Sequence, residues 1–301
     1  MLSIFFYCNF KNKVYNIYTL GDIMEILTEL VTDKTNIIYL NNKYISDNKK
    51  ENIIDIISPS SKRYYSKMYY QNNIWYYFKK DLDYGFYPFT IPEEIIGSYL
   101  ATKLNLRTVE YEIAKVKNNY GIVSKNFKTQ ENFYYTFYDL VDIETNDNID
   151  ILKLFVTEEN YEVLLDQILK LLALDTYMLQ MDRCNINLQF EQNIKTKNIL
   201  LAPIYDYANC IQCVNNDFLT KNILLSVTKS NFAELIQKYP KYKEYLDILL
   251  EQNLKQIWQQ ICIDYKLNQD CFTYDRVSDY YEIKSDNQKK YLKELIKDIH
   301  L

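Results

Sequence analysis

The sequence predicts an α+β fold of two lobes, in which a small antiparallel sheet with one helix precedes a mainly helical lobe. Two hairpin patterns between residues 62 and 124 flank a helix that begins at Thr90. Beyond residue 142 most apolar residues recur at helical spacing, which favours helices there. We therefore divide the chain into an N-terminal segment of unknown role (1–57), a sheet lobe (58–141) and a helical lobe (142–301).

Composition and charge narrow the class of protein. A chain of 301 residues, 48% hydrophobic and 25% charged, is typical of a globular protein with room for two cores. A net charge of −5 gives no long-range attraction to nucleic acid or to an anionic membrane, so we expect neither as a direct partner. The sequence has no apolar run of about 18 residues and no signal-peptide pattern at its start. We expect a cytoplasmic protein, with secretion as an effector left open.

Cysteine, glycine and tyrosine usage limits the kinds of site. The six cysteines do not have the spacing of a small disulfide-linked domain, and Cys210 and Cys213 lack two further zinc ligands, so we expect free thiols. With four glycines, the sequence contains no glycine-rich phosphate-binding motif. The 31 tyrosines fall largely in strand-like segments, where we expect them to pack on sheet faces.

The sheet lobe is predicted from two hairpins. In the first, Lys62–Tyr70 and Ile74–Lys79 flank a Gln-Asn-Asn turn, and in the second, Arg107–Val116 is followed by Tyr120–Ser124. Strand alternation places Lys79 on one face together with two aromatic residues. A lysine that ends a strand can reach nucleotide phosphates, although for Lys79 or its neighbour Lys80 alone a solvated strand end is the simpler interpretation.

The helix between the hairpins begins with the capping-box sequence Thr-Ile-Pro-Glu, in which Thr90 caps the helix and Glu93 answers it. Proline is tolerated in the first turn of a helix. If Glu93 is used in the cap, Glu94 is free to contact another element. In the helical lobe, helical apolar spacing predicts further helices at Phe232–Tyr239, Tyr245–Ile261 and Tyr291–Ile299.

The stretch from residue 174 to 210 carries the candidate chemistry. Apolar spacing predicts a helix that ends near Asp182, with Asp175 facing out, and two strands follow at 186–190 and 199–205 around a polar turn. This hairpin would bring Asp182, Asn187 and Asp206 together. Phosphoryl transfer needs an acceptor for the attacking hydroxyl's proton and oxygen ligands for Mg²⁺, and these three residues could supply both. Capping and turn roles are the alternative for such residues.

The run M-D-R-C-N-I-N-L-Q-F followed by L-A-P-I-Y-D resembles the HipA-like serine/threonine protein kinase family of the HipA C-terminal-domain type. Members carry a D-R-H-x-x-N loop and a later A-P-x-x-D. The resemblance extends from about Ser58 to the C-terminus. It implies a bilobal protein-kinase-like fold and Mg²⁺- and ATP-dependent phosphorylation of a protein substrate. Relatives often act as toxins paired with a DNA-binding antitoxin, or as secreted effectors.

The resemblance also implies roles for individual residues. Asp182 would be the catalytic base, and Asn187 and Asp206 would bind the metal. Lys79 would bind ATP, held by an ion pair with Glu94. Adenine would lie near residues 134–141 and the phosphate-facing loop within residues 58–67, where relatives phosphorylate a serine.

Two departures from the family pattern keep alternatives open. Cys184 stands where the family usually has histidine, and Tyr207-Ala208 stands where ordinary protein kinases have Phe-Gly. A pseudokinase that binds ATP without turnover is one alternative. A lipid or small-molecule kinase is the other, because phosphoinositide kinases carry a similar loop.

Overall fold

The computed structural model describes residues 26–40, 66–72, 74–80, 90–140, 148–181, 183–185, 187–207 and 217–299. Several predictions fall outside these residues, among them those for Asp182, the phosphate-facing loop before residue 66, and the pair Cys210 and Cys213. The cysteines within the described residues are free thiols: Cys184, Cys262 and Cys271.

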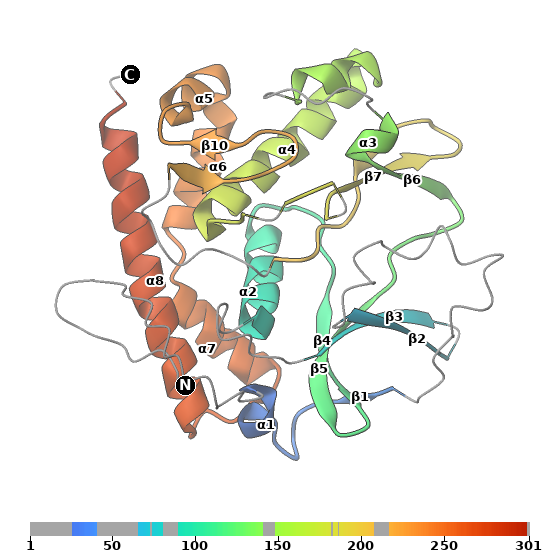
Figure 1. Cartoon of the computed structure of the whole chain (residues 1–301), viewed down its shortest axis with the longest axis vertical. Helices are drawn as coiled ribbons and strands as arrows, with labels where there is room; N and C mark the ends of the chain where they lie inside the picture. Colours follow the sequence, from blue (N-terminus) through green and yellow to red (C-terminus); the bar gives the residue numbers. More distant parts are fainter. Residues whose placement is uncertain are drawn as a thin grey trace, which may run out of the picture.

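The first lobe is built on a five-stranded sheet with the strand order β1-β4-β5-β3-β2. Both predicted hairpins are confirmed as antiparallel pairs. Their strands are β2 (Ser66–Gln71) with β3 (Ile74–Lys80), and β4 (Tyr111–Val116) with β5 (Asn119–Lys125). The two hairpins join through β3 and β5, and helix α2 (Thr90–Lys103) lies between this sheet and the helical lobe (Figure 1).

The described part of the N-terminal segment contacts both the sheet lobe and the C-terminal helices. Helix α1 (Ile26–Leu30) buries Leu27 and Leu30 in the main core, and β1 (Ile38–Tyr39) pairs in parallel with β4. The Thr35 hydroxyl donates a hydrogen bond of 2.8 Å to the carbonyl of Lys266, between the last two helices. Residues 26–40 therefore connect the sheet to the C-terminal helices.

The second lobe is mainly helical, as predicted. Its longest central element is α4 (Glu158–Met178), which packs against α6 (Pro240–Leu250), and α5 (Phe232–Lys238) packs on α6. The predicted helix Tyr245–Ile261 is wrong in one respect, because it is broken into α6 and α7 (Leu254–Asp264). The Asn253 side chain caps α7 by accepting a hydrogen bond from the amide of Gln256.

The C-terminal helix α8 (Phe272–Lys297) is much longer than the predicted Tyr291–Ile299. Its middle, residues 284–290, contains no apolar residue, so helical apolar spacing is interrupted there. In Figure 1, α8 runs along one side of the molecule, with α7 between its lower half and the sheet lobe.

Short elements connect the lobes. A three-stranded sheet has the order β6-β7-β8, formed by β6 (Asn132–Thr136), β7 (Gln189–Asn193) and β8 (Ile199–Leu201). Helix α3 (Phe137–Leu140) follows β6, a 3₁₀ helix η2 spans Asp150–Leu154, and β9 (Phe218–Thr220) pairs with β10 (Val227–Thr228). The predicted hairpin is thus confirmed as β7 and β8, although its first strand runs from Gln189 to Asn193 and not over residues 186–190.

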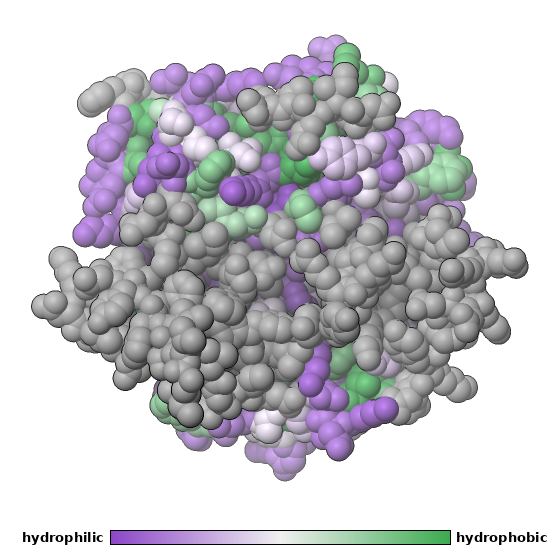
Figure 2. All heavy atoms as spheres, in the orientation of Figure 1, coloured by the Kyte–Doolittle hydropathy of each residue, from purple (hydrophilic) through white to green (hydrophobic). Residues whose placement is uncertain are grey.

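One large apolar core runs through both lobes and includes residues of α2, α4, α6, α7 and β4. A smaller apolar cluster lies on the face of the sheet that carries the Tyr76 and Phe78 side chains. On the helical lobe in Figure 2, the described surface in view is mainly hydrophilic with scattered apolar side chains. None of the helices in the described ranges is both long and apolar enough to span a membrane.

Candidate active site

Lys79 lies at the end of β3 and meets two carboxylates. Its ammonium forms an ion pair with Glu94 of α2, and a second one of 3.1 Å with Asp206. The predicted pairing of Lys79 with Glu94 is therefore present. Strand alternation places Lys80 on the opposite face of β3, so Lys79 is the lysine that enters this cluster.

Glu94 is fully buried and receives three donors. Besides Lys79, the hydroxyl of Tyr111 donates to Glu94 Oε2 at 2.8 Å and the amide of Tyr207 donates to the same oxygen at 2.9 Å. Burial raises the pKa of Tyr111, and the Glu94 carboxylate raises it further, so this hydroxyl remains a donor. A buried carboxylate needs such partners, and here they come from strands β3 and β4 and from the segment after β8.

Charge within the cluster favours the ionised forms. Burial alone would raise the pKa of Asp206, but the Lys79 ammonium outweighs burial, and the pKa lies below its ordinary value. Burial alone would lower the pKa of Lys79, but Asp206 and Glu94 together hold it above the ordinary value. Asp206 is therefore a carboxylate at neutral pH, which is the form that binds a metal ion.

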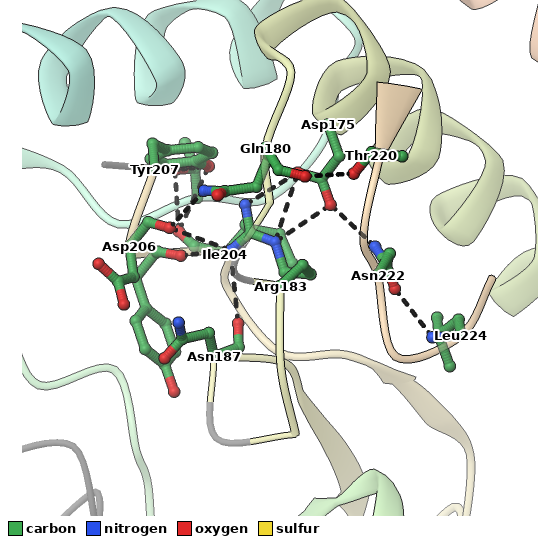
Figure 3. Close-up of polar contacts among 12 residues, drawn as sticks. Asp175, Gln180, Arg183, Asn187, Ile204, Asp206, Tyr207, Thr220, Asn222 and Leu224 are labelled. Carbon is green, nitrogen blue, oxygen red and sulfur yellow. Dashed lines mark hydrogen bonds and ion pairs between the residues drawn. The ribbon is translucent and has the colours of Figure 1, made fainter. Parts of the chain in front are cut away.

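The backbone around Asp206 is held by residues on both sides of Asp182. The Gln180 side chain donates to the carbonyl of Asp206 at 3.1 Å, and Arg183 donates to the carbonyl of Tyr205 at 2.6 Å (Figure 3). Asp206 itself has φ of 61°, in the left-handed region. Asp182 lies outside the described residues, but its neighbours Met181 and Arg183 are described, and the second of them contacts the Asp206 segment directly.

Arg183 is the central residue of this network. It is part of the D-R-C-N-I-N motif, but no role was predicted for it from the sequence. It is buried and paired with Asp175 of α4, with Nη2 at 2.9 Å from the carboxylate. Asn222 donates to the same carboxylate at 2.8 Å. The expectation that Asp175 faces solvent is wrong, because this carboxylate is 1% exposed and neutralises the buried guanidinium.

Asn187 lies on the same network. Its backbone carbonyl is 3.5 Å from Arg183 Nη1, and its side chain is buried. In Figure 3 the side chains of Asn187 and Asp206 extend to the same side of Arg183, away from Asp175. A carboxylate and an amide supply the hard oxygen ligands that Mg²⁺ prefers, so these two residues fit a magnesium site.

Two predicted boundaries around the site differ from the structure. Helix α4 ends at Met178 rather than near Asp182, because Leu179 takes a left-handed conformation with φ of 56° and Gln180 N–H bonds to the carbonyl of Asp175. The second strand ends at Leu201 rather than Tyr205. After it, the chain pairs with the segment before β4, where Ile204 N–H donates to Arg107 O at 2.9 Å.

Tyr207 packs directly on α2. Its ring lies so close to Gly97 that a Cβ atom there would be 2.3 Å from Tyr207 Cγ. The Tyr207 hydroxyl hydrogen-bonds the Thr108 hydroxyl at 2.7 Å, and Arg183 lies 5.5 Å from the ring centre. A glycine in α2 thus allows the residue after Asp206 to contact the helix that carries Glu94.

We predict that Gly97→Ala lowers the free energy of unfolding by about 1–3 kcal/mol, because the added methyl group forces Tyr207 to move. Urea unfolding measures the change. In a Tyr207→Gly background, which removes both the ring and the Cβ atom that the added methyl group would meet at 2.5 Å, the same substitution should be neutral or stabilising by about 1 kcal/mol, since alanine favours a helix more than glycine does. Equal destabilisation in both backgrounds would contradict this packing.

The region predicted to contact adenine lies on β6 and α3. The Tyr134 ring is 5.9 Å from that of Phe127, which is also 5.9 Å from that of Tyr205, just before Asp206. These aromatic side chains connect β6 with the segment that carries the candidate metal ligand. Contact with adenine itself stays a prediction.

Comparison with known proteins places this geometry on a known fold. No protein-family model matches the sequence, and no curated protein matches it. Solved structures do match. The Helicobacter pylori proinflammatory kinase CtkA aligns with a TM-score of 0.51 at 16% identity, over 75% of this chain and 90% of CtkA. The HipA toxin of Shewanella oneidensis, solved with HipB and operator DNA, aligns with a TM-score of 0.56 at 10% identity.

The chain has the HipA-like kinase fold. The match to HipA covers 77% of this chain and 62% of HipA, so part of HipA has no counterpart here. The predicted fold class, a small sheet lobe with one helix and a mainly helical lobe, is confirmed. In this kinase-like fold, Lys79, Glu94 and Asp206 lie where the sheet lobe, α2 and the segment after β8 meet.

Proposed function

We propose that this protein is a Mg²⁺- and ATP-dependent serine/threonine protein kinase. The observation that carries the proposal is the cluster in which Lys79 pairs with both Glu94 and Asp206 on a kinase-like fold. Lys79, held by Glu94, would neutralise nucleotide phosphates, while Asp206 and Asn187 would hold Mg²⁺. In phosphoryl transfer such positioning and charge neutralisation supply most of the catalysis.

Asp182 is proposed as the base that accepts the proton of the substrate hydroxyl. Gln180 and Arg183, which flank it closely, both donate to the Asp206 backbone. A shift of the loop around Asp182 would therefore also displace the segment that carries Asp206. This coupling supports a site in which base and metal ligands act on the same phosphate.

The kinase proposal is tested by transfer of the ATP γ-phosphate to serine or threonine.

The structural similarity to HipA supports two proposed partners. One is a protein substrate, and the other is an antitoxin, by analogy with the system of HipA and HipB. Co-purification of the chain with a protein encoded beside it would support a toxin–antitoxin role.

A pseudokinase is the second candidate, and Cys184 favours it, because the resembling family usually has histidine there. Cys184 adjoins the buried Arg183, and its backbone carbonyl accepts a hydrogen bond of 3.0 Å from the amide of Asn187. The loop is therefore held through its backbone at this position. Restoration of histidine by Cys184→His tests the alternative: a pseudokinase explanation predicts that transfer appears only in the variant.

Removal of Mg²⁺ is expected to weaken ATP binding by about tenfold or more, because Asp206 and Asn187 would hold the metal and its charge would neutralise the nucleotide phosphates. Isothermal titration calorimetry with ATP, in Mg²⁺ and in excess chelator, measures the difference. In Asp206→Asn, the ATP affinities measured with Mg²⁺ and with chelator should become similar. Equal affinity with and without Mg²⁺ in the wild-type protein would contradict the metal assignment.

A further inference from the structure

A buried ion pair joins the C-terminal helix to the start of α2. Lys284 Nζ of α8 lies 2.9 Å from Glu93 Oε1, and the two side chains are 6% and 2% exposed. The Tyr280 hydroxyl lies 3.5 Å from the same oxygen, and the Lys284 ammonium is 5.6 Å from the centre of the Tyr280 ring. Glu93 thus forms a contact that the predicted capping box did not anticipate.

The position of Glu93 makes this pair relevant to the active site. Successive residues of a helix point about 100° apart, so Glu93 and Glu94 leave the first turn of α2 in different directions. Glu94 reaches Lys79 and the Tyr207 amide, while Glu93 reaches α8. The first turn of α2 is therefore held by buried charges on two sides.

The link between α2 and α8 rests on long side chains. Helix α2 packs against α4, α6 and α7, whereas α8 packs against α7 and α1. Across this arrangement the side chains of Lys284 and Tyr280 extend from α8 to Glu93. Such a buried pair adds little net stability over an apolar contact, but removal of one partner leaves a buried charge uncompensated.

We propose that Lys284 is a positioning residue, which orients the first turn of α2 through Glu93 and so holds Glu94 against Lys79. Its effect on ATP rests on the proposed function, whereas its effect on α2 does not. The C-terminal helix would then be a required part of the nucleotide site, although it contributes no residue to the Lys79, Glu94 and Asp206 cluster.

Hydrogen–deuterium exchange of the full chain tests the proposal without any need for activity. In Lys284→Met and in Glu93→Gln, the backbone amides between residues 94 and 98 should exchange about tenfold faster than in the wild type, because the turn loses its anchor on α8. Lys284→Arg, which keeps the charge, should restore most of the protection. Glu93→Gln keeps the size of the side chain but removes the charge that pairs with Lys284, and it carries the comparison if Lys284→Met does not fold.

The matched control is Lys255→Met, which removes an exposed ion pair between α7 and Glu282 of α8. It should leave exchange in α2 unchanged. Wild-type exchange in both Lys284→Met and Glu93→Gln would overturn the proposal, as would equal acceleration by Lys255→Met. ATP titration of the same samples separates the kinase function from the positioning role of Lys284. Failure of the wild-type protein to bind ATP counts against the kinase function alone. Weaker ATP binding in Lys284→Met, with normal binding in Lys284→Arg, supports the positioning role.

Discussion

Asp206→Asn is expected to lower the rate of phosphate transfer from ATP by about 10³-fold while the fold is retained. The substitution keeps the shape of the side chain but removes the charge that pairs with Lys79 at 3.1 Å and that we assign to Mg²⁺. Lys79 still has Glu94 as its partner, so a buried cation is not left alone. Transfer of γ-phosphate, measured beside a urea unfolding curve, separates chemistry from folding.

The matched control for this experiment is Asp247→Asn, which removes the same charge from an exposed pair with Lys243 on α6. It should leave transfer unchanged. Asp182→Ala should abolish transfer as Asp206→Asn does, but ATP should still bind, because the proposed base does not hold the phosphates. Near-normal activity in either variant would contradict the role assigned to that residue.

Arg183→Met is expected to lower the free energy of unfolding by about 3–5 kcal/mol, the largest effect on stability that we predict. The guanidinium is buried and its partner Asp175 is 1% exposed, so the variant leaves a buried carboxylate that keeps the hydrogen bond from the Asn222 amide but loses its charged partner. It also removes the donor to the Tyr205 carbonyl. Urea unfolding at fixed pH measures the shift of the midpoint.

The control for Arg183 is a surface pair of the same charge type. Lys243→Met should cost less than about 1 kcal/mol, since exposed pairs contribute little. Asp175→Asn combined with Arg183→Met should recover part of the loss, because neither buried charge then remains. A decrease of less than about 1 kcal/mol in the free energy of unfolding of Arg183→Met would show that the pair of Arg183 and Asp175 does not stabilise the loop that contains Arg183.

Local patterns were sufficient to predict the elements that carry Lys79 and Glu94. Alternation along Ile74–Lys79 placed Lys79 on the same face of its strand as two aromatic residues, and the capping-box pattern placed Glu94 in the first turn of a helix. The apolar run before Asp206 predicted a strand there, which exists as β8 but ends at Leu201 and not at Tyr205. In each case the signal lies within a few adjacent residues, which is the range over which sequence periodicity is informative.

The network behind these residues could not be predicted in the same way. Asp175 is a charged residue in a helix, and periodicity assigns such a residue to solvent. It is buried because Arg183 reaches it from a loop, and no pattern of spacing encodes that contact. The end of α4 was missed for a related reason, since Leu179 adopts a left-handed conformation that usually signals glycine or asparagine.

The most direct test of the proposed function is the fate of the ATP γ-phosphate. The purified protein is incubated with γ-labelled ATP and Mg²⁺, alone and with a mixture of cellular proteins, and the labelled residues are mapped. We predict label on serine or threonine that is absent when Asp206→Asn replaces the wild type. Bound ATP with no labelled residue would contradict the protein kinase assignment and favour the pseudokinase.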